Sequence, residues 1–202
     1  MAVIVSGQDK ARTLKELAES MRADPSSAFF GSVGTPSSNG GGLAAAWMAH
    51  VMGVEIHGVP YTSTAAILTD VSGSRLRYVF TSAASVKGML ESGNLKALGV
   101  AADAEVSDFP GVPTIQDAGF NKFNSVNWDQ WVGLFAPKDT PPEALEALNS
   151  ALNAAIDDPQ VVAELTKVGL QPFRRRSLKE AKDFWNQQFD AWTALLKQLH
   201  FM

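Results

Sequence analysis

The stretch that decides the fold is AFFGSVGTPSSNGGGLAAAWMAHVMG, residues 28–53. Residues 28–30 are a short apolar run typical of a strand. The helical spacing of Leu43, Trp47 and Val51 predicts a helix at the other end of the stretch. A loop rich in glycine, serine and threonine joins the two. Strand, loop and helix in this order are the unit from which α/β sheets are built.

The same alternation continues on both sides of this stretch. Short apolar runs predict strands at residues 3–5, 56–59, 76–81 and 95–100. Amphipathic runs between them predict helices at residues 13–24, 65–71 and 85–91. This rhythm predicts an α/β fold with an open, mostly parallel sheet and helices on both of its faces.

The pattern changes after residue 110. Residues 131–136 form a strong apolar run that predicts one more strand, and three helices are predicted to follow, at residues 143–157, 159–168 and 178–199. The chain length of 202 residues allows one large domain or two small ones.

Composition argues against several classes of function. The 17 Lys and Arg against 21 Asp and Glu give a net charge of −4, which disfavours nucleic acid and anionic membranes as partners. The absence of cysteine removes disulfides and thiol nucleophiles. No histidine has a second ligand at metal-binding spacing, and no nucleophile has a paired base. We therefore expect no catalytic residue, no metal and no cofactor.

Two features bear on membranes and secretion. No apolar stretch reaches the ~18 residues of a membrane span. Residues 1–7 lack the basic region and cleavage site of a secretory leader, so we expect none in this chain.

Anion binding is the main chemical prediction for the loop at residues 31–42. The loop follows a strand and opens a helix, so backbone N–H groups of the first helical turn converge there. Residues 81–83 form a second junction of this kind and point to the same end of the sheet. The candidate ligand-binding residues are Ser32, Val33, Gly34, Thr35, Ser37, Ser38, Thr81, Ser82 and Ala83. A flexible connector is the alternative interpretation of the loop.

Five segments together resemble the signatures of one family. They are Gly31-Ser32-x-Gly34-Thr35, Val59-Pro60-Tyr61, the SGxLKAL run at 92–98, the FPGVPTIxxAG run at 109–119 and the WxGLFAPxxTP run at 131–141. The family is the Bug-type substrate-binding receptors of tripartite tricarboxylate transporters, and the resemblance covers essentially the whole chain. It implies a periplasmic-binding-protein-like fold of type II and a periplasmic, non-enzymatic receptor. Such a receptor delivers a small organic carboxylate to the membrane subunits of the transporter.

The resemblance also implies a division of the chain. Residues 1–125 would be the complete ligand-binding second domain of the family. Residues 126–202 would be the crossover strand and the C-terminal helices of the first domain, whose N-terminal part is missing. Tyr61 would line the wall of the ligand site, with Trp128 and Asp129 near the crossing between domains. Core packing is the alternative for Tyr61 and Trp128.

Two questions stay open from the sequence. A small cytosolic α/β enzyme acting on a phosphate- or carboxylate-bearing metabolite is the alternative to a receptor. The last predicted helix also carries an apolar stripe, made of Ala181, Phe184, Trp185, Gln188, Phe189, Trp192, Leu195, Leu196 and Leu199. We expect this stripe to dock against a second copy of the chain or a missing N-terminal segment. The alternative is that it folds back on residues 1–125.

Overall fold

The computed structural model describes residues 1–104, 106–126, 128, 131–167, 172 and 175–200. The chain forms two compact units. The first comprises residues 1–130 together with 193–202, and the second comprises residues 131–192.

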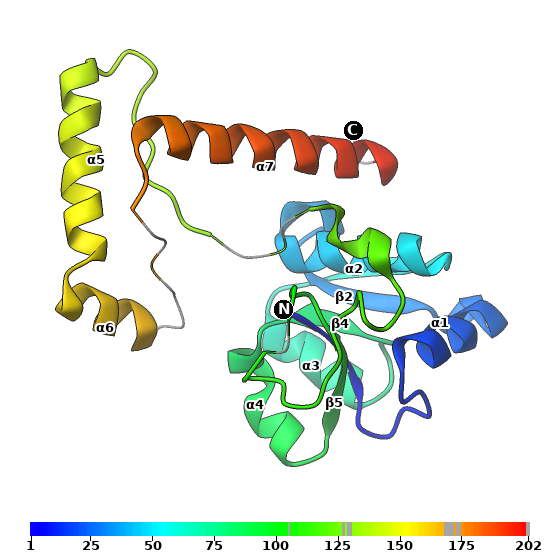
Figure 1. Ribbon diagram of the computed structural model, residues 1–202. Coiled ribbons are helices and arrows are strands. Elements are labelled where there is room, and N and C mark those ends of the chain that lie inside the picture. The colour runs from blue at the N-terminus through cyan, green and yellow to red at the C-terminus, as the bar shows by residue number, and fades with distance from the viewer. Residues whose placement is uncertain (105, 127, 129–130, 168–171, 173–174, 201–202) are drawn as a thin grey trace. The chain divides into compact units, whose positions relative to one another are not determined.

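Five strands make up the sheet of the first unit. They are β1 (Ala2–Ser6), β2 (Phe29–Val33), β3 (His57–Tyr61), β4 (Val79–Thr81) and β5 (Leu95–Val100). Strand β1 lies between β4 and β5 and is antiparallel to both, while β2 and β3 pair in parallel. A single parallel bridge from Phe30 to Tyr78 joins the two sets of strands. Four strands therefore run in one direction and β1 runs against them (Figure 1).

The mostly parallel sheet that the sequence predicts is confirmed, with β1 as the strand that runs against the other four. All five residues of β1 are buried, so its sequence is a continuous apolar run rather than an alternating one. Such a run indicates burial on both faces and carries no information on direction. The direction of β1 is set by its neighbours β4 and β5, which lie far along the chain.

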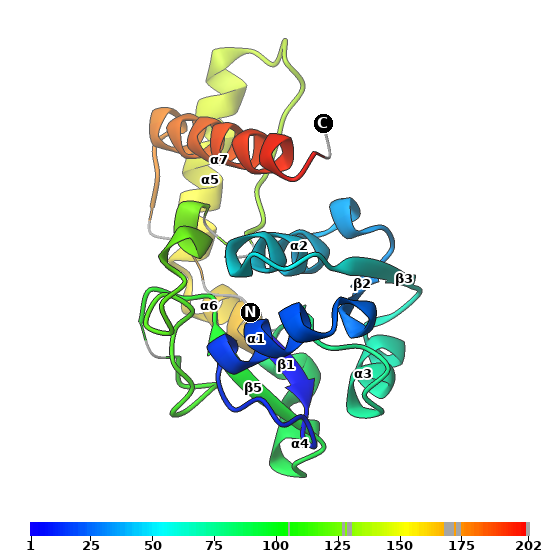
Figure 2. The same cartoon turned by 90° about the vertical axis from the view of Figure 1, so that its right-hand side faces the viewer.

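Helices cover both faces of this sheet, as predicted (Figure 2). The four helices are α1 (Leu14–Ala23), α2 (Gly40–Met52), α3 (Thr64–Ser72) and α4 (Ala83–Glu91). Ala2 and Ile4 of β1 pack with apolar side chains of α3 and α4 on one face. On the other face, the Tyr78 hydroxyl donates to the Ala45 carbonyl of α2 at 2.6 Å. Leu14 of α1 lies against β5 on that same face.

Side chains cap the first turns of α1 and α2. The Thr13 hydroxyl accepts a hydrogen bond from the Glu16 amide at 3.2 Å, which confirms the predicted start of α1. Helix α2 begins at Gly40, earlier than its apolar spacing predicts, because the Asn39 side chain caps it. It ends at Gly53, whose φ of +65° is the left-handed conformation that favours glycine. Three short 3-10 turns, η1 (Pro25–Ser27), η2 (Pro36–Ser38) and η3 (Asn121–Ser125), complete the unit.

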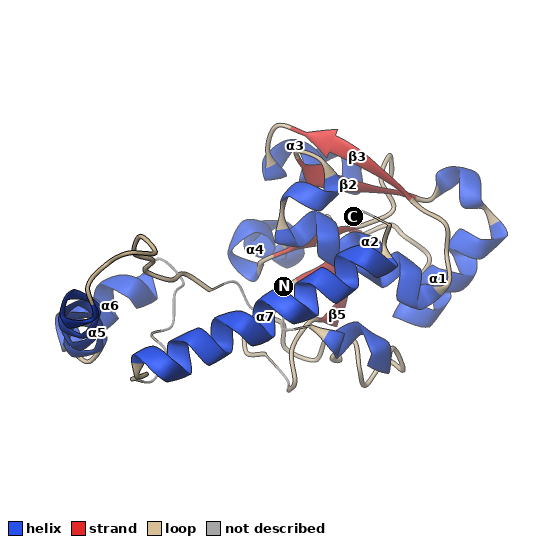
Figure 3. Cartoon of the chain, turned by 90° about the horizontal axis from the view of Figure 1, so that it is seen from above, coloured by secondary structure: helices blue, strands red, loops and turns tan. Residues whose placement is uncertain are grey.

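The second unit is built from helices. It contains α5 (Pro142–Ile156), α6 (Pro159–Lys167) and most of α7 (Leu178–Gln198), so the three predicted helices are confirmed (Figure 3). A capping box begins α7, in which the Ser177 hydroxyl accepts from the Glu180 amide at 3.2 Å. None of the described helices is long and apolar enough to cross a membrane.

The strand predicted at residues 131–136 is wrong. Residues 131–137 have no regular secondary structure, and no strand among the described residues pairs with them. Trp131 packs edge-on against Phe184 and Trp185 of α7, with ring centroids 5.4 and 5.9 Å apart. The predicted domain division at 125/126 concerns the family's domains and stays a prediction.

Candidate ligand-binding site

A pocket of about 220 Å³ opens in the first unit, where β2 and β4 end and three helices begin. No charged side chain lines it. The lining residues are Met1, Gly31, Ser32, Val33, Asn39, Gly41, Gly42, Thr64, Ile67, Val79, Phe80, Thr81, Ser82 and Ser85.

Three helix N-termini converge on this pocket. Helix α2 begins at Gly40, α3 at Thr64 and α4 at Ala83, and residues of each first turn, or the residue just before it, line the pocket. The first amides of a helix have no carbonyl partner within the helix, and they form the positive end of its dipole. The arrangement therefore favours a bound anion without any cationic side chain.

Asn39 ties the end of β2 to the start of α2. Its Nδ2 donates to the Ser32 hydroxyl at 3.0 Å and to the Val33 carbonyl at 2.5 Å. Its Oδ1 accepts from the Gly42 amide at 2.9 Å. The buried Ser32 hydroxyl in turn donates to the Thr35 carbonyl at 3.3 Å. These bonds fix the loop at both of its ends, which disfavours its interpretation as a mere connector.

The three glycines at the start of α2 differ in how much space a side chain would have at each position. A Cβ on Gly42 would lie 2.5 Å from the Pro36 carbonyl oxygen and would also overlap the Ser32 hydroxyl. A Cβ on Gly41 would lie 3.0 Å from the Phe80 carbonyl oxygen of β4. A Cβ on Gly40 would meet nothing within 4 Å. The close approach of α2 to β2 therefore requires glycine at 42, whereas a side chain at 41 would press on β4 and one at 40 is tolerated.

Four of the predicted ligand residues line the pocket, namely Ser32, Val33, Thr81 and Ser82. Their contact with a ligand stays a prediction. The sequence analysis missed Asn39, Gly41, Gly42, Thr64 and Ser85. The signals that could have found them are the Asn-Gly-Gly-Gly run before α2 and the Ser63-Thr64 pair that begins α3.

The other predicted loop residues do not line the pocket. The Gly34 amide donates to the Tyr61 carbonyl at 2.9 Å, so β3 occupies the donor expected for a ligand. Thr35, Ser37 and Ser38 are exposed in and before η2, and the Ser38 hydroxyl donates to the Thr35 carbonyl at 2.7 Å. The half-buried Ala83 packs against the core between the sheet, α3 and α4.

Tyr61, which the resemblance places on the wall of the ligand site, has hydrogen-bond partners outside the pocket lining. The Tyr61 hydroxyl donates to Asp70 at 2.5 Å, and Asp70 pairs with Arg75. Burial, followed by the bond to Asp70, raises the pKa of Tyr61 to about 12. Hydrogen bonds from Arg75 and Tyr61 hold the pKa of Asp70 below its usual range.

Trp128 is a core residue of the first unit. It is buried, its Nε1 donates to the Phe123 carbonyl at 2.9 Å, and its ring stacks on that of Phe123 at 4.8 Å. The structure therefore favours core packing for Trp128, whereas Tyr61 is half-buried and its contact with a ligand stays a prediction. Asp129 lies outside the described residues. Within the described residues, no group of three His, Asp or Glu side chains is placed to hold a metal ion.

Comparison with known sequences places the chain in a family. The profile described as "Tripartite tricarboxylate transporter family receptor" matches residues 1–201. A protein from the clcB-clcD intergenic region of Pseudomonas knackmussii is 30% identical over 156 residues, covering 76% of this chain and 89% of that protein. One from the tcbD-tcbE intergenic region of Pseudomonas sp. is 31% identical over 170 residues, covering 84% of this chain. This chain spans only 49% of that second relative.

Solved structures show the same fold. Rpa4515 of R. palustris with adipate matches at a TM-score of 0.75 and 22% identity, and the periplasmic binding protein BugD at 0.76 and 23%. MatC of Rhodopseudomonas palustris with bound malate matches at 0.72 and 22%. These matches cover 96–98% of this chain and 64–65% of the others, and they confirm the predicted periplasmic-binding-protein fold. On the family profile and these relatives, the chain belongs to the receptors of the tripartite tricarboxylate transporter family.

Proposed function

We propose that this chain carries the ligand-binding domain of a periplasmic solute receptor. It binds a small carboxylate in the pocket where α2, α3 and α4 begin, and it delivers that solute to the membrane subunits of a tripartite tricarboxylate-type transporter. The observation that carries the proposal is the convergence of three helix N-termini on a pocket that no charged side chain lines.

The chemistry of the pocket suits a carboxylate. The helix dipoles and the hydroxyls of Thr81 and Ser82 supply positive potential and hydrogen-bond donors to an anion, while the Ser32 hydroxyl already donates to the Thr35 carbonyl. Ile67 and Phe80 supply apolar wall for a short carbon chain. The lack of a cationic side chain avoids a strong ion pair and so favours reversible binding. Rpa4515 with adipate and MatC with malate, which share this fold, support the choice of dicarboxylates as test solutes.

The proposal is of a receptor rather than an enzyme. The residues that line the pocket include no carboxylate, histidine or lysine that could act as a general base. The alternative, a small metabolite-converting enzyme at the same loop, would need such a group. Adipate or malate incubated with the chain should therefore be recovered chemically unchanged, as mass spectrometry would measure.

Calorimetric titration with adipate and malate tests the site. Gly41→Ala places a methyl group 3.0 Å from the Phe80 carbonyl inside the pocket, so we expect affinity at least roughly tenfold weaker, a loss of about 1.4 kcal/mol. Gly40→Ala is the matched control, because a methyl group there meets no neighbour and affinity should stay unchanged. Equal affinities in the two variants, or a folded chain that binds neither solute, would contradict the proposal.

A further inference from the structure

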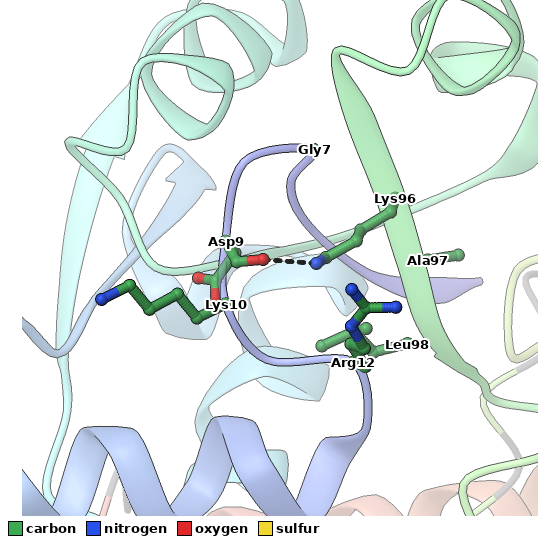
Figure 4. Close-up of a pocket in the computed structure, with 7 residues that line it drawn as sticks. All are labelled: Gly7, Asp9, Lys10, Arg12, Lys96, Ala97 and Leu98. Atoms are coloured by element: carbon green, nitrogen blue, oxygen red, sulfur yellow. Dashed lines mark hydrogen bonds between the residues drawn. The ribbon is translucent and has the colours of Figure 1, made fainter.

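A second, larger pocket of about 590 Å³ lies at the opposite end of the sheet (Figure 4). The first pocket adjoins Met1 at the beginning of β1, whereas the second adjoins Gly7 at its end and the beginning of β5. Its lining residues are Gly7, Asp9, Lys10, Arg12, Lys96, Ala97 and Leu98. We call it the basic pocket, since three of these seven side chains are cations.

The turn after β1 brings the cations together. The Gly7 amide donates to the Asn94 carbonyl at 2.9 Å, and a Cβ on Gly7 would overlap the Gly93 carbonyl. Only glycine allows this close approach, which lays residues 7–12 along the first residues of β5. Arg12 and Lys96, far apart in the sequence, consequently face the same space (Figure 4).

Asp9 carries the one carboxylate that lines the basic pocket, and both of its oxygens already have partners. Asp9 Oδ1 accepts from the Ala11 amide at 2.8 Å, and Oδ2 pairs with Arg77 at 3.3 Å. The Asp9 side chain is only 8% exposed. Asp9 therefore pairs with Arg77, which lies outside the lining of the pocket. No described carboxylate forms an ion pair with the side chain of Arg12 or Lys96, although Glu16 accepts from the Arg12 backbone amide at 2.7 Å.

The two cations are left with unused donors. The ammonium of the half-buried Lys96 donates to the Asp9 backbone carbonyl at 2.5 Å, a neutral acceptor, and has two further N–H groups. The Arg12 guanidinium points toward Lys96 and makes no ion pair with any described residue (Figure 4). Two like charges that face one space repel each other unless an anion lies between them.

We propose that the basic pocket binds the phosphate group of a small phosphate monoester. One group with two negative charges compensates both cations at once, whereas a carboxylate brings only one charge. The guanidinium of Arg12 presents a planar fork that matches phosphate oxygens, and the Lys96 ammonium adds a point charge beside it. This site is separate from the carboxylate pocket and does not depend on the function proposed for that pocket.

Titration calorimetry at pH 8 and low salt tests the proposal, with methyl phosphate and methyl sulfate as probes. A phosphate monoester has its second pKa near 6 and is a dianion at pH 8, while methyl sulfate has a similar shape and a single charge. We expect methyl phosphate to bind at least roughly fivefold more tightly. Arg12→Gln and Lys96→Gln should each weaken it by up to about fivefold, the upper end of the range for one exposed ion pair.

Control variants separate this site from general charge effects. Lys87→Gln removes an exposed lysine on α4 and should change the affinity less than twofold. Gly41→Ala should leave methyl phosphate binding intact, and Lys96→Arg should retain it. Thermal unfolding of each variant verifies its fold, and Lys96→Gln keeps a donor for the Asp9 carbonyl. Equal binding of both probes, no binding, or equal losses in Lys87→Gln and Lys96→Gln would overturn the proposal.

Discussion

At the residue scale, the two tyrosines of the chain are held by their hydroxyl groups. Tyr61 donates to the Asp70 carboxylate at 2.5 Å, and the fully buried Tyr78 donates to the Ala45 carbonyl at 2.6 Å. Burial is the main reason why the pKa of each hydroxyl is raised above its usual 10. The native state therefore favours the neutral form of both side chains.

The raised pKa of Tyr61 predicts how the free energy of unfolding depends on high pH. A folded pKa of about 12 for Tyr61, above 10 in the unfolded chain, stabilises the fold fully below pH 10. That contribution is lost as the pH rises from 10 to 12. In an absorbance titration of phenolate, the folded chain should show little ionisation at pH 10, whereas the chain in concentrated urea should be half ionised there.

Tyr61→Phe is the control for this titration. It leaves Tyr78 alone, which should ionise only above the range where Tyr61 does. A folded wild-type chain in which half of the tyrosine absorbance titrates near pH 10 would contradict the prediction.

Single residues also show which parts of a candidate pocket lining a sequence can predict. Ser32, Thr81 and Ser82 are predictable because a hydroxyl at a strand-to-helix junction is a local signal, and the fold brings such junctions together. The surroundings of Tyr61 and Trp128 are harder to predict from the sequence. Tyr61 is positioned by Asp70 and Trp128 by the Phe123 ring, and these contacts form only when the chain packs. The Gly34 amide shows the same limit, because it donates to the Tyr61 carbonyl of β3, a partner that the loop sequence does not reveal.

At the scale of elements, the capping residues of α1 and α2 differ in how many groups they bond. Thr13 makes one capping bond to the Glu16 amide, whereas Asn39 caps α2 and also holds Ser32 and Val33. We expect Thr13→Ala to lower the free energy of unfolding by about 1 kcal/mol. Asn39→Ala should lower it by about 2 kcal/mol, because it also leaves the Val33 carbonyl and the Ser32 hydroxyl without a donor.

Urea denaturation measures both losses, and adipate titration separates their consequences. Thr13→Ala should leave adipate affinity unchanged, since α1 lies outside the pocket lining. Asn39→Ala should weaken it, because the start of α2 is released. The same affinity in both variants would show that Asn39 serves only the stability of its helix.

Two apolar runs show why strands are harder to predict than helices. Residues 95–100 and 131–136 both have the composition of a strand, yet only the first becomes one. Strand β5 forms its ladder with β1, whereas residues 131–136 pair with no strand in the part of the chain that the structure describes. Helices α5, α6 and α7 need no such partner for their backbone bonds, and their predicted limits agree closely with the structure.

At the scale of the whole molecule, the second unit leaves much apolar surface uncovered. Val132, Leu134 and Phe135 are 80, 65 and 63% exposed, and Trp185 and Phe189 of α7 are 41 and 57% exposed. We call these five residues the apolar face. No residue of α5 or α6 is fully buried. Soluble monomers rarely expose apolar patches beyond a few hundred Å², so this face calls for a covering surface.

In a solution of the purified chain, a second copy can supply such a covering surface. We therefore expect the chain to self-associate as its concentration rises in sedimentation velocity experiments. Phe135→Gln combined with Phe189→Gln should shift the chain toward monomer, while Gln187→Ala, on the opposite side of α7, should not. A monomer at every concentration would contradict self-association through this face.

The antiparallel strand β1 has a consequence for synthesis. Its partners in β5 lie about ninety residues further along the chain, so β1 leaves the ribosome long before they do. At ~5–20 residues per second, the delay is on the order of 5–20 s. During that time the AVIVS segment, apolar in its first four residues, has no ladder to join and is a ready template for pairing with other chains. We expect such a nascent chain to need shielding of this strand until the centre of the sheet can close.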